Sequence, residues 1–197
     1  MNKLYMALLC GALVLASATA DAQTNVRVRG TITAFDGQVL SVQSRDGKDL
    51  KLQLAENATV AAAKAITLND LKSGDYVGST TMRSADGKLV AREVHTIART
   101  VPEGHGPWDL EPDSTMTNAN VAAVVTAAGG HELTLEYKGG SQKILVPEGT
   151  PIVTTVPADR SLLVPGTYVF IAAQVASDGT MTAMRIQASK DGVRPPQ

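Results

Sequence analysis

The sequence predicts an all-β protein of two tandem five-stranded β-barrels, each with a short helical turn between its third and fourth strands. Residues 28–98 recur at residues 120–190, shifted by 92 positions over much of their length. A repeat of about 70 residues is too long for a solenoid unit and suits a complete small domain. Each copy runs three strands, a helical turn and two strands, which is the element order of an OB-like Greek-key barrel.

In the first copy, assigned to residues 23–101, β-branched and alternating apolar residues mark the strands and Asp-Gly pairs mark the turns. Asp-Gly favours a tight hairpin because both central positions of the turn prefer positive φ. The expected elements are strands at 28–35, 39–43 and 50–54, a looser segment at 55–67, a helical turn at 68–71, and strands at 75–82 and 88–98. Thr67 and Asp70 form a pattern like a capping box at the start of the helical turn.

The second copy, assigned to residues 119–190, gives the same series of elements. Its expected elements are strands at 121–126, 132–137 and 142–146, a turn at 161–164, and strands at 168–175 and 180–188. Residues 102–118 then form an acidic, Trp-containing linker, and residues 191–197 a C-terminal tail. Because each barrel alone has a modest core, we expect the two to pack together.

The first copy resembles a bacterial domain-of-unknown-function family of small secreted OB-like barrels, which often occur in tandem. The matching pieces are Val28-Arg29-Gly30-Thr31-Ile32, Asp70-Leu71-Lys72-Ser73-Gly74-Asp75-Tyr76-Val77 and Asp86-Gly87-Lys88-Leu89-Val90-Ala91-Arg92-Glu93-Val94. The second copy departs from this pattern, with Leu163-Val164-Pro165-Gly166-Thr167 in place of the charged run. The resemblance implies a barrel located in the cell envelope, and it supplies neither catalytic residues nor a ligand.

The first 22 residues have the pattern of a secretory signal peptide. Lys3 gives a basic start, residues 8–15 are apolar, and Ala20-Asp21-Ala22 is a small-x-small cleavage pattern. The single cysteine, Cys10, lies inside this segment, so the mature chain would have no disulfide. No later run of eighteen apolar residues follows, so no transmembrane segment is expected after cleavage. We therefore expect a periplasmic or secreted protein.

Charge and motifs exclude several classes of function. The formal net charge is −1, and a near-neutral protein lacks the basic footprint of a nucleic-acid binder, so no nucleic-acid partner is expected. The sequence has no nucleophile elbow, phosphate-binding glycine loop or zinc-protease helix motif. We therefore expect that the protein is not an enzyme and needs no cofactor, apart from a divalent metal in one hypothesis below.

That hypothesis concerns the linker, which holds the only tryptophan, one of three histidines and four acids. Imidazole and carboxylate groups are ligands of divalent metals, so His105, Asp109 and Glu111 are candidate metal ligands. Trp108 is a candidate ligand or interface residue. The simpler interpretation is that Trp108 packs the linker between the barrels while the acids face water.

Glu93 and His95 are a second candidate pair, because residues two apart on a strand leave the same face. They could take part in a ligand contact or an interface. The interpretation we favour is a solvated strand face, since polar pairs usually occupy exposed positions. Their counterparts in the second copy are Arg185 and Gln187, so a site built on this pair would be unique to one barrel.

These observations predict an exported, non-catalytic binding or scaffolding protein of the bacterial cell envelope. Its expected partner is an envelope protein, a polysaccharide or a small anion. The alternative hypothesis is a periplasmic metal-binding protein that uses His105 and Asp109 of the linker.

Overall fold

A computed structural model describes residues 23–197, so the expected signal peptide, residues 1–22, lies outside the described residues. The described chain consists of β-strands and two single-turn 3₁₀ helices, η1 (Leu68–Asp70) and η2 (Arg160–Leu162). The all-β prediction is therefore confirmed. Within residues 23–197 no helix is long and apolar enough to cross a membrane.

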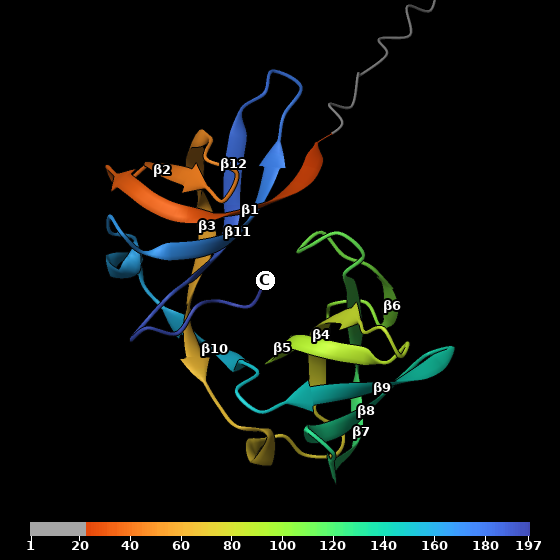
Figure 1. Cartoon of the computed structure of the whole chain (residues 1–197). Coiled ribbons are helices and arrows are strands. Elements are labelled where there is room, and N and C mark those ends of the chain that lie inside the picture. The colour runs from red at the N-terminus through yellow and green to blue at the C-terminus, as the bar shows by residue number, and fades with distance from the viewer. Residues whose placement is uncertain (1–22) are drawn as a thin grey trace, which may run out of the picture.

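The strands form one hydrogen-bonded network (Figure 1). They are β1 (Thr24–Phe35), β2 (Val39–Ser44), β3 (Asp49–Ala65), β4 (Tyr76–Arg83), β5 (Leu89–Thr96), β6 (Gly104–Pro107), β7 (Thr115–Ala127), β8 (Gly130–Tyr137), β9 (Gly140–Pro147), β10 (Ile152–Ala158), β11 (Tyr168–Val175) and β12 (Met181–Ala188).

Five strands from the two ends of the described chain close one barrel. Strand β1 pairs with β2, β2 with β3, β3 with β12 in parallel, β12 with β11, and β11 with β1. We call this barrel the split ring, because its strands come from two separated segments. In Figure 1 it is the upper lobe, where orange and blue strands lie side by side.

The strands from the middle of the chain form a second circuit of pairings, which we call the continuous ring. Strand β4 pairs with β5 and β7, β7 with β8, and β8 with β9. Two residue pairs between β5 and β9, again parallel, close the circuit. Figure 1 shows it as the lower lobe of yellow, green and teal strands.

The strand pairings correct the expected domain boundaries. Strands 1–3 of the first copy do not pair with strands β4 and β5 of that copy; they pair with β11 and β12 of the second copy. Two hydrophobic cores follow this exchange, one for each ring. The two copies carry the same alternating pattern, so either partner buries the same apolar face. The pattern therefore cannot specify which copy supplies the last two strands.

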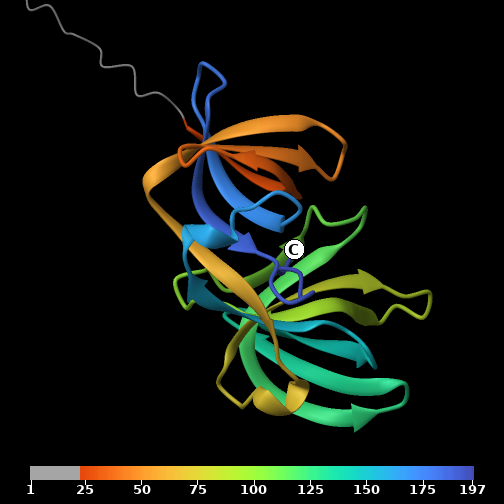
Figure 2. The same cartoon turned by 90° about the vertical axis from the view of Figure 1, so that its left-hand side faces the viewer.

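The segment expected to be loose, residues 55–67, is mostly the second half of the long strand β3. It pairs antiparallel with β10, from Val60 opposite Ala158 to Ala65 opposite Val153. These two segments are equivalent in the repeat, so they form a ribbon with local twofold symmetry where the chain crosses between the rings (Figure 2). The loose assignment failed because strand formation depends on cross-strand partners, which local composition does not reveal.

The helical turn before β4 is confirmed as η1. Both the backbone N–H and the hydroxyl of Thr67 donate to the Asp70 carboxylate at 2.8 Å. The linker and tail are more ordered than expected. Linker residues form β6 and the start of β7, and residues 191–197 turn back between the rings, where Pro195 and Pro196 are buried.

Candidate functional site

A cleft of about 710 Å³ lies between the two rings. Ligand sites in proteins have volumes of this order and often lie at the junction of two structural units. The cleft is lined by Arg27, Thr59, Ala61, His95, Thr96, Ile97, Ala98, Val101, Pro102, Trp108, Met116, Asn118, Thr155, Phe170, Ala172, Arg185, Gln187, Pro196 and Gln197. We call it the seam cleft.

Strand alternation in the split ring presents one wall of the seam cleft. On β12, Ile186 points into the core of the split ring, so its neighbours Arg185 and Gln187 point outward. Phe170 and Ala172 of β11 flank the core residue Ile171 in the same way. The outer surface of the split ring is therefore a wall of the cleft rather than a free surface.

The continuous ring presents the opposite wall. A register shift between β4 and β5 follows Thr80, and beyond it Val94 faces the core. Glu93 and His95 therefore face outward from the continuous ring, toward the split ring. Their expected solvated face is wrong: their exposed fractions are only 6% and 8%. Sequence alternation placed them on one face correctly, but it could not show that a second ring covers that face.

Glu93 and His95 form a buried polar pair, with Nδ1 of His95 lying 3.5 Å from Oε1 of Glu93. The carboxylate also accepts hydrogen bonds from the Gln197 backbone N–H at 2.8 Å and the Thr80 hydroxyl at 3.3 Å. Burial raises the pKa of Glu93 to about 7 and lowers the pKa of His95 to about 4. Loss of hydration disfavours the charged form of each group, so the pair is held in its neutral state.

Gly78 of β4 makes room for the imidazole ring. A Cβ atom at this position would lie 2.6 Å from Nε2 of His95 and 3.2 Å from Oδ1 of Asn118. Contacts that short are not tolerated, so a glycine is required for the ring to lie against the strand. The ring keeps one buried nitrogen, Nδ1, without a hydrogen-bond partner among the described residues.

The loop between β6 and β7 carries Trp108 into the cleft. Its ends are joined by the Trp108 N–H, which donates to the Ser114 carbonyl at 2.8 Å. The Ser114 hydroxyl lies 3.1 Å from the Trp108 carbonyl and 2.8 Å from the Glu111 carbonyl, which braces the loop from inside. Trp108 is half-buried, and its indole N–H donates to the Gln197 backbone oxygen at 3.0 Å. This contact supports the expectation that Trp108 packs the linker between the two barrels.

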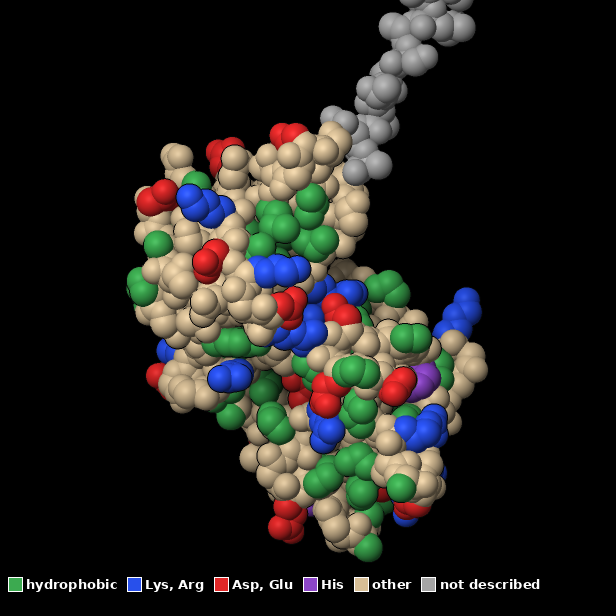
Figure 3. All heavy atoms as spheres, turned by 45° about the horizontal axis from the view of Figure 1, so that its top comes forward, with side chains coloured by type: hydrophobic (Ala, Val, Ile, Leu, Met, Phe, Trp, Pro, Cys, Tyr) green, Lys and Arg blue, Asp and Glu red, His purple; other side chains and the backbone are tan. Residues whose placement is uncertain are grey.

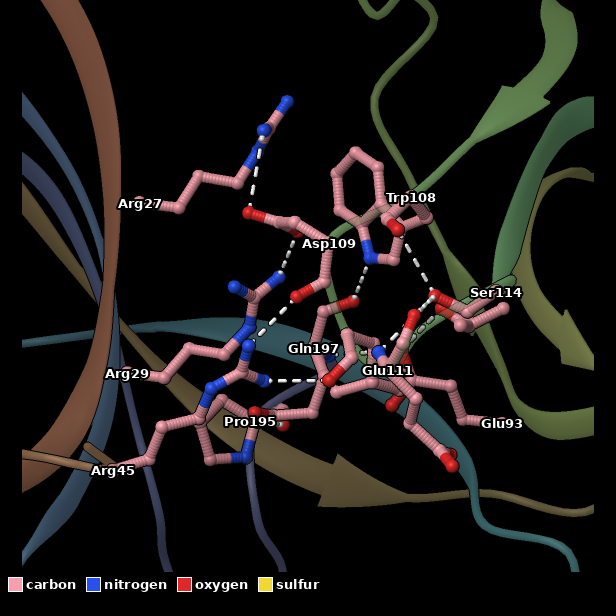
Figure 4. A network of polar contacts seen from close by, with 12 residues as sticks. Arg27, Arg29, Arg45, Glu93, Trp108, Asp109, Glu111, Ser114, Pro195 and Gln197 are labelled. Atoms are coloured by element: carbon pink, nitrogen blue, oxygen red, sulfur yellow. Dashed lines mark hydrogen bonds and ion pairs between the residues drawn. The ribbon is translucent and has the colours of Figure 1, made fainter.

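Three arginines of β1 and the adjoining turn hold this loop (Figure 4). The Arg29 guanidinium, buried with 3% of its side chain exposed, donates to Asp109 at 2.8 Å. Arg45 donates to the backbone carbonyls of Asp109 and Leu110. Arg27 lies 4.2 Å from the centre of the Trp108 ring, a cation–π distance. Figure 3 shows charged side chains of both signs gathered where the lobes meet.

The proposed metal ligands do not come together. His105 pairs with the Thr117 hydroxyl at 2.8 Å, and Glu111 forms an ion pair with Arg92 at 2.9 Å. Burial acts to raise the pKa of Asp109, but the hydrogen bond and charge of Arg29 outweigh it and lower that pKa. In the described part of the chain, no three His, Cys, Asp or Glu side chains are grouped as metal ligands. The acids of the linker serve instead as partners for arginines.

The charge of the seam cleft contrasts with that of the whole chain. Two arginines, Arg27 and Arg185, line the cleft, and no carboxylate does. The whole chain has a formal net charge of −1. Arg27 has only a long, half-exposed contact with Asp109 at 3.6 Å, and such surface pairs are weak. The cleft therefore has a local positive potential.

Several residues of the cleft were not singled out as site residues from the sequence. Arg185 and Gln187 were noted only as counterparts of Glu93 and His95, and Phe170 only as one of few aromatic residues. The structure brings these counterparts into one seam, because the exchange of strands turns the fifth strand of each copy toward the other ring. A signal was present in the sequence: equivalent strand positions carry different polar residues in the two copies.

Comparison with known proteins gives one family match. The model of a domain of unknown function (DUF5666) matches residues 123–187, which is less than half of the chain. The resemblance to a domain-of-unknown-function family is confirmed in this general form, but the match falls on the second copy rather than the first. The matched segment begins in β7 and ends in β12, so it contributes strands to both rings. No curated protein and no solved structure matched the chain.

Proposed function

We propose that this is an exported, non-catalytic binding protein of the cell envelope that holds a small organic anion with an apolar part in the seam cleft. The observation that carries the proposal is the lining of the cleft: two arginines, two aromatic rings and several amide and hydroxyl groups, with no carboxylate. Export rests on the signal-peptide pattern of residues 1–22.

The topology supports an OB-like description of each ring. In repeat order, the strands of both rings follow 1-2-3-5-4, with the third and fifth strands parallel. We infer a tandem pair of OB-like barrels whose copies have exchanged their last two strands. OB barrels are frequently binding modules, and this analogy adds to the argument from the cleft without replacing it.

The arrangement of the walls matches an amphipathic anion. Phe170 and Trp108 offer apolar area, while Arg185 has no hydrogen bond or ion pair to another described residue and projects from β12. An arginine without a protein partner keeps all its N–H donors for a ligand. Asn118 and Gln187 add neutral donors and acceptors that would orient the ligand.

The test uses two aromatic probes that differ only in charge: anilinonaphthalene sulfonate and its neutral analogue N-phenylnaphthylamine. Trp108 is the only tryptophan, so its fluorescence reports directly on the cleft. We expect the sulfonate to bind and Arg185→Gln to weaken it about tenfold, because an exposed charge-assisted hydrogen bond contributes about 1.5 kcal/mol.

Binding of the neutral analogue should change little in Arg185→Gln. The matched control is Lys51→Gln, which removes one exposed positive charge that lines none of the pockets. Equal affinity of the two probes for the unmodified chain, or equal weakening by both variants, would refute a specific anion site in the cleft.

A further inference from the structure

Residues 193–197 (Val-Arg-Pro-Pro-Gln) lie in the seam as an extended segment. After β12 the chain reverses at a tight turn, in which Asp191 and Gly192 both have positive φ and Lys190 pairs with Val193. The segment then runs back between the rings, next to Trp108 (Figure 4). Pro195 and Pro196 are buried there.

The seam holds this segment through groups that any peptide backbone offers. Trp108 donates its indole N–H to the Gln197 backbone oxygen at 3.0 Å, and Glu93 accepts from the Gln197 backbone N–H at 2.8 Å. One donor and one acceptor of the seam thus contact the main chain of the same residue. Backbone contacts of this kind do not depend on the identity of the residue bound.

Side-chain contacts select for the residues around the two prolines. The Arg194 guanidinium lies 4.7 Å from the centre of the Tyr168 ring, and the Tyr168 hydroxyl contacts the Gln197 side chain at 3.1 Å. Two aromatic residues, Trp108 and Tyr168, therefore flank a Pro-Pro step. Grooves with exposed aromatic rings and an N–H donor recognise proline-rich segments, whose extended form loses little entropy on binding.

The groove continues on both sides of the segment. The seam cleft of about 710 Å³ lies on one side. A second cavity of about 720 Å³, lined largely by apolar residues of the β3–β10 crossing, lies on the other. Gln197 lines both cavities, so the segment forms a partition between them. A longer peptide lying in its place would find room at each end.

We propose that the seam is a receptor groove for a proline-rich peptide of the Arg-Pro-Pro-Gln type, presented by a partner protein. Residues 193–197 are the occupant of that groove in the conformation described here. A partner peptide competes with this internal occupant, whose effective concentration is on the order of millimolar because it is tethered. Weakening the internal occupant therefore strengthens binding of the same sequence supplied from outside.

The experiment measures binding of a fluorescein-labelled peptide, Asp-Gly-Val-Arg-Pro-Pro-Gln, to the full chain by fluorescence polarisation. The perturbing variant is Gly192→Ala, which strains the tight turn at φ 79° and leaves the seam residues intact. The matched control is Gly179→Ala, which places the same strain (φ 84°) in the hairpin between β11 and β12. We expect Gly192→Ala to bind the peptide at least tenfold more tightly than the unmodified chain, and Gly179→Ala to match the unmodified chain.

A second variant, Pro195→Gly with Pro196→Gly, loosens the internal segment without altering the turn. We expect it to bind the labelled peptide more tightly as well, and a peptide with alanine in place of both prolines to bind at least tenfold more weakly. Adding Trp108→Phe, which removes the indole N–H donor, should reverse at least fivefold of the gain. Arg185→Gln, which weakens anion binding, should leave peptide affinity unchanged, so this proposal can fail separately from the proposed function.

Three results would overturn the proposal. The first is no peptide binding to either loosened variant when circular dichroism shows both are folded. The second is equal binding of the proline and alanine peptides. The third is binding of anilinonaphthalene sulfonate without binding of any peptide, which would make residues 193–197 a fixed part of the fold and leave the anion site standing. If both loosened variants unfold, failure of millimolar peptide to displace the internal segment from the unmodified chain, followed by Trp108 fluorescence, also overturns it.

Discussion

The buried pair Glu93 and His95 predicts two opposite pH dependences of stability. The pKa of Glu93 rises from 4.5 to about 7 on folding, so between these pH values the folded state holds a proton that the unfolded state has released. Its contribution to stability is complete below pH 4.5 and is lost as the pH rises through 7. The pKa of His95 falls from 6.5 to about 4, so its contribution is complete above pH 6.5 and is lost as the pH falls through 4.

The magnitude follows from the size of these pKa differences. At about 1.4 kcal/mol per pH unit, each group changes the free energy of unfolding by about 3 kcal/mol across its window. Both side chains are about nine-tenths buried, so screening by solvent reduces these values little. The two slopes oppose each other between pH 4.5 and 6.5. In the unmodified chain they nearly cancel, and removal of either group exposes the other.

The assay is urea unfolding of Glu93→Gln and His95→Gln at steps from pH 4 to 8, each compared with the unmodified chain at the same pH. Relative to that chain, Glu93→Gln should gain about 3 kcal/mol between pH 4.5 and 7, and His95→Gln should lose about 3 kcal/mol between pH 4 and 6.5. Glu136→Gln, which removes an exposed carboxylate, is the matched control. A flat difference curve for Glu93→Gln would show that the carboxyl group is hydrated and the reasoning wrong.

Three further predictions concern packing, charge and topology. Gly78→Ala should cost about 1–3 kcal/mol of stability, because its methyl group would lie 2.6 Å from His95 Nε2, whereas Gly106→Ala, which meets open space, should cost much less; thermal unfolding of both variants checks this. Asp109→Asn should cost about 3 kcal/mol in urea unfolding, because it leaves the buried Arg29 without its carboxylate, whereas the exposed Asp113→Asn should stay within about 0.5 kcal/mol. In a Cys10→Ser chain, cysteines at Val26 and Ala173, which are partners between β1 and β11, should form a disulfide on oxidation. Cysteines at Val26 and Thr81 should not, and a crosslink there on a non-reducing gel would restore barrels built from consecutive segments.

Much of the local structure could be predicted from the sequence. The Asp-Gly pairs mark real hairpin turns, and glycines such as Gly37 and Gly87 have the positive φ that those turns need. The capping pair Thr67 and Asp70 contact each other as expected. These features depend on residues close together in the chain, so their physical causes are present in the sequence itself.

The site was only partly predictable. Trp108 and the acids of the linker were recognised as unusual, and Glu93 and His95 were placed correctly on one face. Their burial, the partner of each acid and the role of Arg185 depend on which surface lies opposite. For Asp109 that partner is Arg29, eighty residues away along the chain, and no spacing rule connects the two.

The sequence by itself determined that the chain forms β-strands, that two equivalent sets of them exist, and where most turns lie. Strand alternation, β-branched residues and turn glycines act over a few residues, so they operate in the same way in any tertiary context. Only the tertiary structure decided which set of strands closes which ring. The two copies present equivalent apolar faces, so the choice depends on the β3–β10 crossing and on the groups that meet in the seam. That choice turns two ordinary strand faces into the walls of a cleft.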